Sequence, residues 1–331
     1  MTLCLGLEST AHTFSAGIVD ESGDDSGHIL SVVNDTYVPT EGGLHPLKTS
    51  NHHVECFQDV IRQALDKASV QARDIELIAF SQGPGLGPCL RVGASVARTL
   101  HEFLDVPIVG VNHCIAHIEI GRLTCKVDDP LTLYVSGGNT IVSAFDCGRY
   151  QVFGETLDIA LGNMLDTFAR EAKLQHPGGP KIEALAKKST NYIELPYTVK
   201  GMDLALSGLL TAAIRALNDH SLEDVAFSLQ ETAFSMVAEV TERALAHTEK
   251  SDILLTGGVA ANQHLQQMIA SIAADHGSTF HVVPRELAGD NGAMIAWTGL
   301  LQFQNSGGLE LEQTGVKPRW RLDEVPIPWR A

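Results

Sequence analysis

The stretch Leu131–Cys147, "LTLYVSGGNTIVSAFDC", predicts two apolar strands joined by a short turn that contains two glycines. The same order of strand, turn and strand opens the chain at residues 3–20, "LCLGLESTAHTFSAGIVD". In both places we expect a third strand next, at residues 28–38 and 149–156, followed by helices that alternate with strands. The sequence therefore predicts two copies of one α/β pattern.

A duplicated α/β pattern with a glycine turn in each half resembles the fold shared by actin, sugar kinases and heat-shock chaperone ATPases. In that fold a nucleotide binds in the cleft between two lobes. We expect an N-terminal lobe at residues 1–128 that carries a pair of histidines, and a C-terminal lobe at residues 129–288 that carries glycine loops. Residues 289–331 are expected to form a closing helix and a tail that pack across the cleft.

Composition and charge restrict the possible functions. The 331 residues are enough for two domains. The net charge is −17, and lysines and arginines cluster only in local groups such as Lys187–Lys188, whereas binding a polyanion needs a basic patch. Either the substrate is not a nucleic acid, or a partner supplies the positive surface. No apolar run is long enough to span a membrane, and the N-terminus has no secretory signal. Six cysteines without a C-x-x-C pair are typical of reduced thiols in a cytoplasmic protein.

The segment Gly110–Gly121, "GVNHCIAHIEIG", places His113 and His117 four residues apart on an expected helix. Imidazoles at positions i and i+4 share a helix face and can offer nitrogens to one metal ion. In the zinc-protease motif H-E-x-x-H a glutamate follows the first histidine and acts as a general base. Cys114 occupies that position here, which indicates a metal pair without a protease base. Cys114 is either a ligand or a core residue, and buried thiols favour the core.

One carboxylate and two further histidines are also candidates for a metal site. Asp290, in "AGDNGAM", lies where the last helix is expected to begin. It is either the N-cap of that helix or a metal ligand together with His113 and His117. His52 and His53 have charged neighbours on an expected helix, so we interpret them as surface or cleft-lining residues and not as ligands.

Three glycine loops in the second half form a candidate nucleotide site. "YVSGGNT" (134–140) is either an anion-binding loop or a plain hairpin turn. "LTGGVAAN" (255–262) follows a buried strand and precedes a helix, an arrangement that can place a phosphate at a helix N-terminus. "HPGGP" (176–180) precedes a helix with Glu183, and Asp166 lies one helix earlier. These two carboxylates either hold ribose hydroxyls or are exposed helix charges.

Five motifs in order carry a resemblance to a known family: "NHCIAHIEIG", "LYVSGGNT", "HPGGPKIE", "LTGGVAAN" and "DNGAMIA". Together they closely resemble the archaeal and eukaryotic branch of the tRNA N6-adenosine threonylcarbamoyltransferase family, formerly described as O-sialoglycoprotein endopeptidases. The resemblance covers residues 6–330. It implies an acyltransferase that moves the threonylcarbamoyl group from threonylcarbamoyl-AMP to N6 of adenosine 37 in tRNAs reading codons that begin with adenine. The resemblance further implies that AMP is released and that the protein is the catalytic subunit of the KEOPS complex.

The resemblance also implies which residues hold the metal and the nucleotide. The implied ligands of one divalent metal, usually Fe(II) with Zn(II) as an alternative, are His113, His117, Tyr134 and Asp290. The implied contacts of the adenine nucleotide (threonylcarbamoyl-AMP, ATP or AMP) are Tyr134, Val135, Ser136, Gly137, Gly138, Asp166, Gly179, Glu183 and Asn262. We expect no catalytic residue beyond these ligands, because an activated mixed anhydride needs positioning more than a strong base.

The implied partners are tRNA, a kinase-like KEOPS subunit and further small KEOPS subunits, with no membrane contact and a cytoplasmic location. In some archaea the kinase is fused at the C-terminus; this sequence ends at Ala331, so we expect the kinase to lie outside it. Three other classes of protein remain as alternatives to the transferase. An actin-like ATPase or small-molecule kinase would need Mg-ATP but not His113. A metalloprotease is disfavoured by Cys114, and a nucleotide-binding scaffold is disfavoured by the complete set of metal residues.

Overall fold

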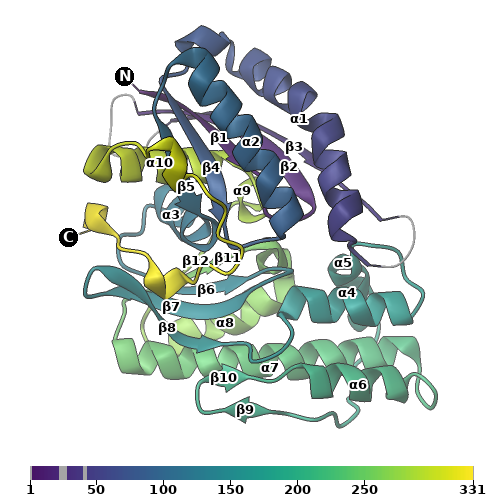
Figure 1. Cartoon of the computed structure of the whole chain (residues 1–331). Coiled ribbons are helices and arrows are strands. Elements are labelled where there is room, and N and C mark those ends of the chain that lie inside the picture. The colour runs from purple at the N-terminus through teal and green to yellow at the C-terminus, as the bar shows by residue number, and fades with distance from the viewer. Residues whose placement is uncertain (1, 22–27, 40–42, 331) are drawn as a thin grey trace. The chain divides into compact units, whose positions relative to one another are not determined.

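Two five-stranded mixed sheets with one shared strand order form the fold (Figure 1). The computed structural model describes residues 2–21, 28–39 and 43–330. These residues divide into two compact units. The first unit comprises the chain up to residue 126 together with 146–150 and the segment from 290 onward, and the second comprises 127–145 and 151–289.

The sheet of the first unit has the strand order β3-β2-β1-β4-β5. Its strands are β1 (Leu3–Glu8), β2 (Thr13–Asp20), β3 (His28–Thr36), β4 (Leu77–Gly83) and β5 (Ile108–Asn112). β2 pairs antiparallel with both β1 and β3, whereas β4 pairs parallel with both β1 and β5. Every residue of β4 and β5 is buried, as expected for parallel strands that helices cover on both faces.

Four helices cover the two faces of this sheet. They are α1 (Pro46–Ala68), α2 (Gly87–Leu104), α3 (His113–Cys125) and α10 (Gly292–Ser306). α1 and α2 form a core with the apolar side chains of β1 and β2, while α10 packs against β1, β2, β4 and α3. Short 3-10 turns complete the unit: η1 (Ala72–Asp74), η3 (Leu311–Gln313), η4 (Leu322–Glu324) and η5 (Pro328–Arg330).

The start of α10 lies directly on β1 and β2 because glycines stand at the crossing. A Cβ added to Gly6 of β1 would overlap the carbonyl oxygen of Gly292, so neither position has room for a side chain. The Gly292 N–H also donates a hydrogen bond to Ser15 Oγ at 2.8 Å. These contacts fix the first turn of α10 and, with it, the position of Asp290 just before that turn.

The sheet of the second unit has the order β12-β11-β6-β7-β8, which is the order of the first sheet read from its other edge. Its strands are β6 (Leu131–Val135), β7 (Thr140–Asp146), β8 (Arg149–Glu155), β11 (Asp252–Thr256) and β12 (Thr279–Val282). β6 pairs antiparallel with β7 and parallel with β11, so β6 corresponds to β1 of the first unit. The duplicated strand pattern is thus present in the structure.

Helices and a small hairpin surround the second sheet. The helices are α4 (Leu161–Glu171), α5 (Gly178–Ala186), α6 (Ser207–Ala216), α7 (Leu222–Thr248), α8 (Gln263–Asp275) and α9 (Arg285–Ala288). The hairpin pairs β9 (Val199–Lys200) with β10 (Asp203–Leu204). α7 packs against α5, α6 and α8, and it contributes the largest group of buried helical residues in the core of this unit.

The loop after β11 differs from the expected direct passage from glycines into a helix. A 3-10 turn, η2 (Gly258–Ala261), intervenes, and α8 begins only at Gln263. Gly257 has a φ of +97°, and a Cβ there would overlap the carbonyl oxygen of Val135. The glycine is therefore required by its contact with the end of β6, and it does not itself open the helix.

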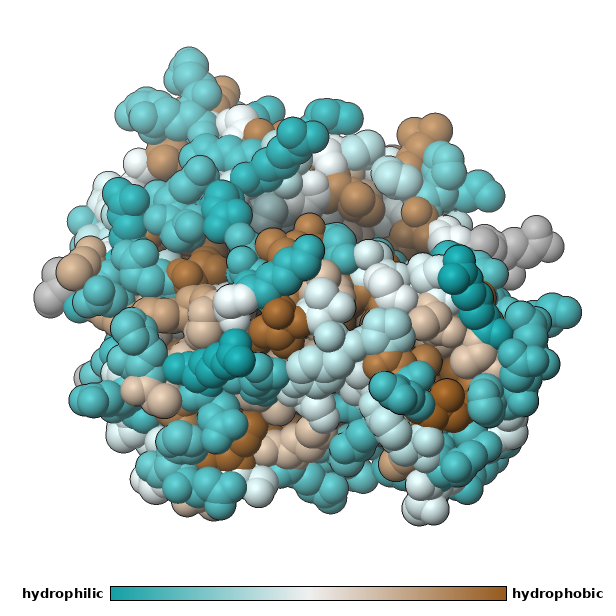
Figure 2. Space-filling model, turned by 90° about the horizontal axis from the view of Figure 1, so that it is seen from below, coloured by the Kyte–Doolittle hydropathy of each residue, from teal (hydrophilic) through white to brown (hydrophobic). Residues whose placement is uncertain are grey.

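The three-part division expected at residues 128 and 288 remains a proposal about the organisation of the chain. In the structure the segment from residue 290 onward belongs to the first unit. No helix of the described residues has the length and apolar character needed to cross a membrane. On the face shown in Figure 2, hydrophobic residues form separate patches among hydrophilic ones.

Candidate metal and nucleotide sites

The histidine pair lies at the start of α3, where β5 ends. The helix begins at His113 because the Asn112 side chain accepts hydrogen bonds from the N–H groups of Cys114 and Ile115, at 3.0 and 3.3 Å. The predicted helix is thus confirmed. His113 and His117 lie one turn apart with ring centroids separated by 4.7 Å, and both side chains are buried.

Asp290 completes a cluster with the two histidines. One donor atom from each of the three side chains lies within 4.8 Å of the other two. Asp290 Oδ1 is 3.5 Å from His113 Nε2 and 3.3 Å from His117 Nε2. The N-cap of α10 is Asn291, whose side chain accepts the Met294 N–H at 2.9 Å. The cap is therefore the neighbouring residue, and the Asp290 carboxylate faces the histidines.

Glu8 stands behind this cluster and was not expected from the sequence. Its carboxylate is fully buried at the end of β1, with Oε2 2.9 Å from His113 Nδ1. Its other oxygen accepts the Thr10 N–H at 2.6 Å. A carboxylate that accepts the Nδ1–H of an imidazole leaves Nε2 free to donate its lone pair, which is the usual arrangement behind a metal-binding histidine. The signal in the sequence was a charged residue at the end of an apolar strand.

Charge coupling inside the cluster shifts the pKa of each member. Burial opposes the charged form of His113, but the carboxylates of Glu8 and Asp290 outweigh it and raise the pKa of His113 to about 9. Burial lowers the pKa of His117. Burial also opposes ionisation of Asp290, yet the charge of His113 and the hydrogen bond from His117 lower its pKa below the usual range. A cation entering the cluster must therefore displace the proton of His113.

The structure also shows the surroundings of Cys114, His53 and His52 in the first unit, three residues whose environment the sequence predicts. The Cys114 thiol is buried, and burial raises its pKa to about 12, as expected for the core alternative. His53 is fully buried and its Nε2 lies 2.9 Å from the carbonyl oxygen of Ala11, so the prediction of a surface or cleft-lining residue was wrong for His53. The side chain of His52 is 22% exposed and lies beside Asp35.

In the second unit, the first glycine loop forms a tight turn between β6 and β7. The Asn139 N–H donates to Ser136 Oγ at 3.1 Å, and the Ser136 N–H donates to the Asn139 carbonyl at 2.8 Å. No described atom of this unit lies within 4 Å of a Cβ built on Gly137 or Gly138. Packing within the unit therefore does not require glycine at either position. Tyr134, at the end of β6, is buried and receives a long hydrogen bond of 3.5 Å from Asn139 Nδ2.

Asp166 and Glu183 both hold loops of the second unit in place. Asp166 Oδ1 accepts the Gly178 N–H at 2.7 Å and so ties α4 to the start of α5, next to Gly179. Glu183 Oε1 accepts from Lys187 Nζ at 2.8 Å and from the N–H of Gln263 at 3.3 Å. The side chains of Asp166 and Glu183 are 33% and 16% exposed, so both are partly accessible to solvent beside these loops.

Asn262 is the N-cap of α8, a structural role that was missed. Its Oδ1 accepts the N–H groups of His264 and Leu265 at 2.9 and 3.2 Å, and its Nδ2 donates to Gln230 Oε1 at 3.0 Å. An asparagine directly before an apolar helix is a recognisable capping signal. The contact between Glu183 and Gln263 brings this cap next to α5. Of the predicted nucleotide residues, Asp166, Gly179, Glu183 and Asn262 thus lie along connected segments of α4, α5 and α8.

The sequence of this chain is similar to those of known proteins over nearly its whole length. The tRNA N6-adenosine threonylcarbamoyltransferase family model matches residues 28–297. The tRNA N6-adenosine threonylcarbamoyltransferase of Methanococcoides burtonii is 54% identical, over 100% of this chain and 98% of its own. A "Probable bifunctional tRNA threonylcarbamoyladenosine biosynthesis protein" of Methanothermobacter thermautotrophicus is 58% identical over 99% of this chain, which spans 61% of that relative.

Solved structures support the fold. HypF from T. kodakarensis superimposes on 95% of this chain and 49% of its own with a TM-score of 0.62, at 16% identity. At that identity the likeness concerns the fold alone, and it confirms the prediction of a duplicated actin-like α/β fold. The family model spans most of the chain, and the sequence relatives share more than half of its residues. The predicted family and enzyme class are therefore confirmed: this chain belongs to the tRNA N6-adenosine threonylcarbamoyltransferase family of transferases.

Proposed function

We propose that this chain is the metal-dependent catalytic subunit that transfers threonylcarbamoyl from threonylcarbamoyl-AMP to N6 of adenosine 37 in tRNA. The tRNAs concerned would be those that read codons beginning with adenine, and AMP would be the second product. The observation that carries the proposal is the convergence of His113, His117 and Asp290, with Glu8 behind them, in a member of this family.

The donor set of the cluster fits a divalent transition metal. Two imidazole nitrogens and one carboxylate oxygen form the combination that Fe(II) favours when other positions stay open, and Zn(II) accepts the same donors. The hydrogen bond to Glu8 fixes the orientation of the His113 ring. We propose Tyr134 as the fourth ligand. A metal bound here would supply Lewis-acid polarisation of the threonylcarbamoyl group.

The adenine nucleotide is assigned to the loops of the second unit. We propose contacts with Tyr134, Val135, Ser136, Gly137, Gly138, Asp166, Gly179, Glu183 and Asn262. Gly137 and Gly138 support this assignment because nothing in the packing of their unit demands glycine there. A missing Cβ lets a ligand approach the backbone N–H groups closely. The partly exposed carboxylates of Asp166 and Glu183 are suited to accept hydrogen bonds from ribose hydroxyls.

The proposed transfer requires mainly that the two reactants are held in position. The N6 amine of the adenosine forms a bond to the carbamoyl carbon while the bond from that carbon to the phosphate oxygen breaks. The amine loses one proton to solvent, and AMP takes up the electron pair of the broken bond. Backbone N–H groups of the glycine loops would stabilise the leaving phosphate, so a strong general base is not needed.

The charge of the chain determines what its partners must supply. With a net charge of −17, the chain has an overall field that repels tRNA. We propose that a kinase-like KEOPS subunit and further small KEOPS subunits bring the tRNA, in the cytoplasm. The bifunctional name of the Methanothermobacter relative, which extends beyond the matched segment, supports a second activity in the same process.

The test is transfer of labelled threonylcarbamoyl to tRNA by the chain together with its partner subunits. We expect label in the tRNA when metal is present, none after chelation, and recovery when Fe(II) or Zn(II) is restored. His113→Ala should abolish the transfer. An actin-like ATPase or small-molecule kinase would instead turn over Mg-ATP and be indifferent to His113→Ala, and that result would overturn the proposal.

A further inference from the structure

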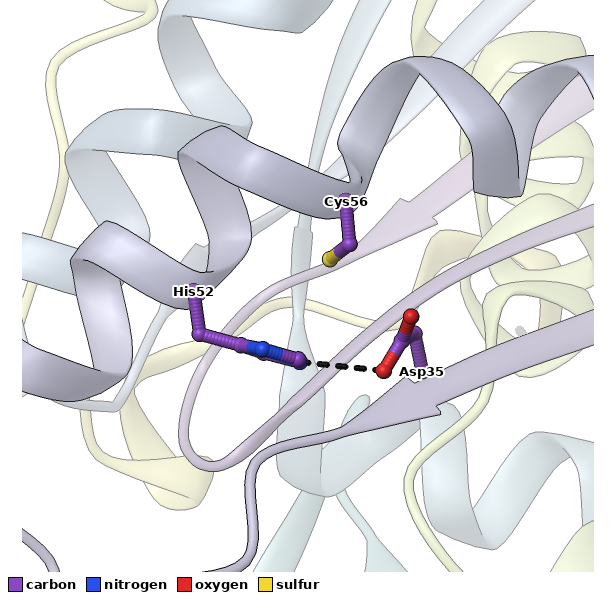
Figure 3. A group of neighbouring side chains, drawn as sticks. All are labelled: Asp35, His52 and Cys56. Atoms are coloured by element: carbon purple, nitrogen blue, oxygen red, sulfur yellow. Dashed lines mark ion pairs between the residues drawn. The ribbon is translucent and has the colours of Figure 1, made fainter.

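A second group of potential metal ligands lies at the edge of the first sheet (Figure 3). It consists of Asp35 on β3 and of His52 and Cys56 on α1. One donor atom of each side chain lies within 4.8 Å of the other two. The group shares no residue with the cluster of His113, His117 and Asp290.

Local geometry explains why these three side chains meet. His52 and Cys56 occupy positions i and i+4 of α1, so they share one face of the helix. Asp35 pairs directly with Phe14 of β2, and directly paired residues point to the same face of a sheet. Phe14 packs against Phe57 of α1, with ring centroids 6.5 Å apart. The Asp35 carboxylate therefore lies on the helix-facing side of an edge strand, as Figure 3 shows.

The imidazole of His52 is held in place but its inner nitrogen lacks a well-directed partner. His52 Nε2 is buried and lies 3.1 Å from Asp35 Oδ1, an ion-pair contact that Figure 3 marks with a dashed line, but it makes no well-directed hydrogen bond to any described group. The centroid of the Tyr37 ring lies 5.7 Å from that of the His52 ring, so the two rings are neighbours. A buried ring nitrogen without a hydrogen bond is unfavourable, and a cation between the donors would remove that cost.

We propose that Asp35, His52 and Cys56 bind Zn(II). One sulfur, one nitrogen and one oxygen are all ligand types that Zn(II) accepts, and water would complete a tetrahedron. Ligand atoms of such a tetrahedron lie about 3.3–3.7 Å apart, so side-chain adjustments of about an ångström complete the site. The side chains of His52 and Asp35 are 22% and 47% exposed, which gives an ion a path from solvent.

Binding has a defined proton balance and a structural consequence. Burial and the charge of Asp35 keep the Cys56 thiol protonated in the absence of metal. On binding, the S–H bond breaks, the S–Zn(II) bond forms, and the proton passes to solvent. The ion would connect α1 to the edge strand β3. Because it binds only the folded chain, it should raise the melting temperature of the first unit.

Four variants separate this site from the cluster assigned to transfer: a triple variant, and the same variant with one of three further replacements. The full chain with His113, His117 and Asp290 all replaced by Ala should still bind one equivalent of Zn(II) in equilibrium dialysis. Bound Co(II) should give the near-ultraviolet thiolate-to-cobalt charge-transfer band in this variant. Adding His52→Ala or Asp35→Asn should remove both signals, and so should Cys56→Ser. Circular dichroism checks that each variant folds. If Cys56→Ser fails to fold, the variants at the partly exposed residues His52 and Asp35 decide the outcome.

Matched controls use residues of the same type elsewhere. Cys147→Ser changes an exposed thiol, and His220→Ala changes an exposed imidazole, so both should leave the Zn(II) count and the cobalt band unchanged. In the otherwise unchanged chain, His52→Ala should lower the count from two equivalents to one. Absence of Zn(II) from the triple variant, or a cobalt band that survives both His52→Ala and Asp35→Asn, would overturn the proposal.

Discussion

Glu8 Oε2 lies 2.9 Å from Nδ1 of His113, and both side chains are buried. The two residues are 105 positions apart in the chain and come from different elements of the first unit, β1 and α3. This contact orients the imidazole so that its second nitrogen faces His117 and Asp290. Glu8 is therefore a positioning residue for the proposed metal site.

Replacement of Glu8 by Ala should lower metal affinity by about 10–100-fold, the usual effect of losing a carboxylate behind a metal-binding histidine. Glu8→Gln retains a hydrogen-bond acceptor for the Nδ1–H of His113, so it should lower the metal affinity less than Glu8→Ala does. Competition with a chelator measures the affinity. Glu102→Gln, which changes an exposed glutamate on α2, is the control. Equal affinities for Glu8→Ala and the parent chain would show that His113 needs no support from Glu8.

His113→Ala and Asp290→Ala should each abolish bound metal and transfer while the fold stays intact. Each change removes one of three converging donors, and neither removes a helix cap, since Asn112 and Asn291 cap the two helices. Metal analysis and circular dichroism on the same samples measure both effects. Because metal is also proposed to bind at Asp35, His52 and Cys56, both variants are made in a chain that carries His52→Ala. Full metal occupancy in both variants would contradict the assignment.

Glu183→Ala and Asn262→Ala should weaken binding of AMP without removing metal. The two residues lie beside the glycine loops of the second unit and outside the metal cluster. Asn262→Ala also removes the α8 cap, so it should lower the free energy of unfolding by about 1 kcal/mol. Asn262→Asp preserves the capping oxygen and isolates the loss of the amide donor. Calorimetry with AMP is the test, and unchanged affinity in both Ala variants would place the nucleotide elsewhere.

The isolated chain should bind tRNA weakly, because its net charge of −17 lets it neutralise few phosphates. Partner subunits should raise the affinity sharply and make binding more sensitive to salt, since they would release more counterions. Filter binding across a salt series, with and without the partners, measures both effects. Tight and salt-sensitive binding by the chain alone would reveal a basic surface assembled from distant lysines and arginines.

The free energy of unfolding should fall as the pH falls from 6.5 towards 4, because of His53. Burial lowers the pKa of His53 from 6.5 to about 4, so in this range the unfolded chain binds a proton that the folded chain does not. The loss is at most roughly 1.4 kcal/mol per pH unit and stops below the folded pKa. In denaturation experiments with a chelator present, the free energy of unfolding should depend less steeply on pH for His53→Gln than for the parent chain. The control His220→Gln, at an exposed position, should keep the parent slope.

The duplicated α/β pattern, the histidine helix and the glycine loops could all be predicted from the sequence. Each of these depends on local periodicity or on residues that are close in the chain, such as His113 and His117 four positions apart. Strand and helix periods are properties of the backbone, so they can be read before packing is known. The position of the Asp290 carboxylate could not be read, because a shift of one residue decides whether Asp290 or Asn291 is the cap.

Which side chains from distant parts of the chain meet could not be predicted and depends on how the elements pack. Glu8 reaches His113 because β1 ends where α3 begins, on the same side of the first unit's sheet. Asp290 reaches both histidines because glycines let α10 lie against β1. Asp35 meets His52 and Cys56 because it shares a sheet face with Phe14, beneath α1. The burial of these groups, their contact partners and their electrostatic surroundings arise from long-range packing. The spacing of residues along the chain therefore does not predict them.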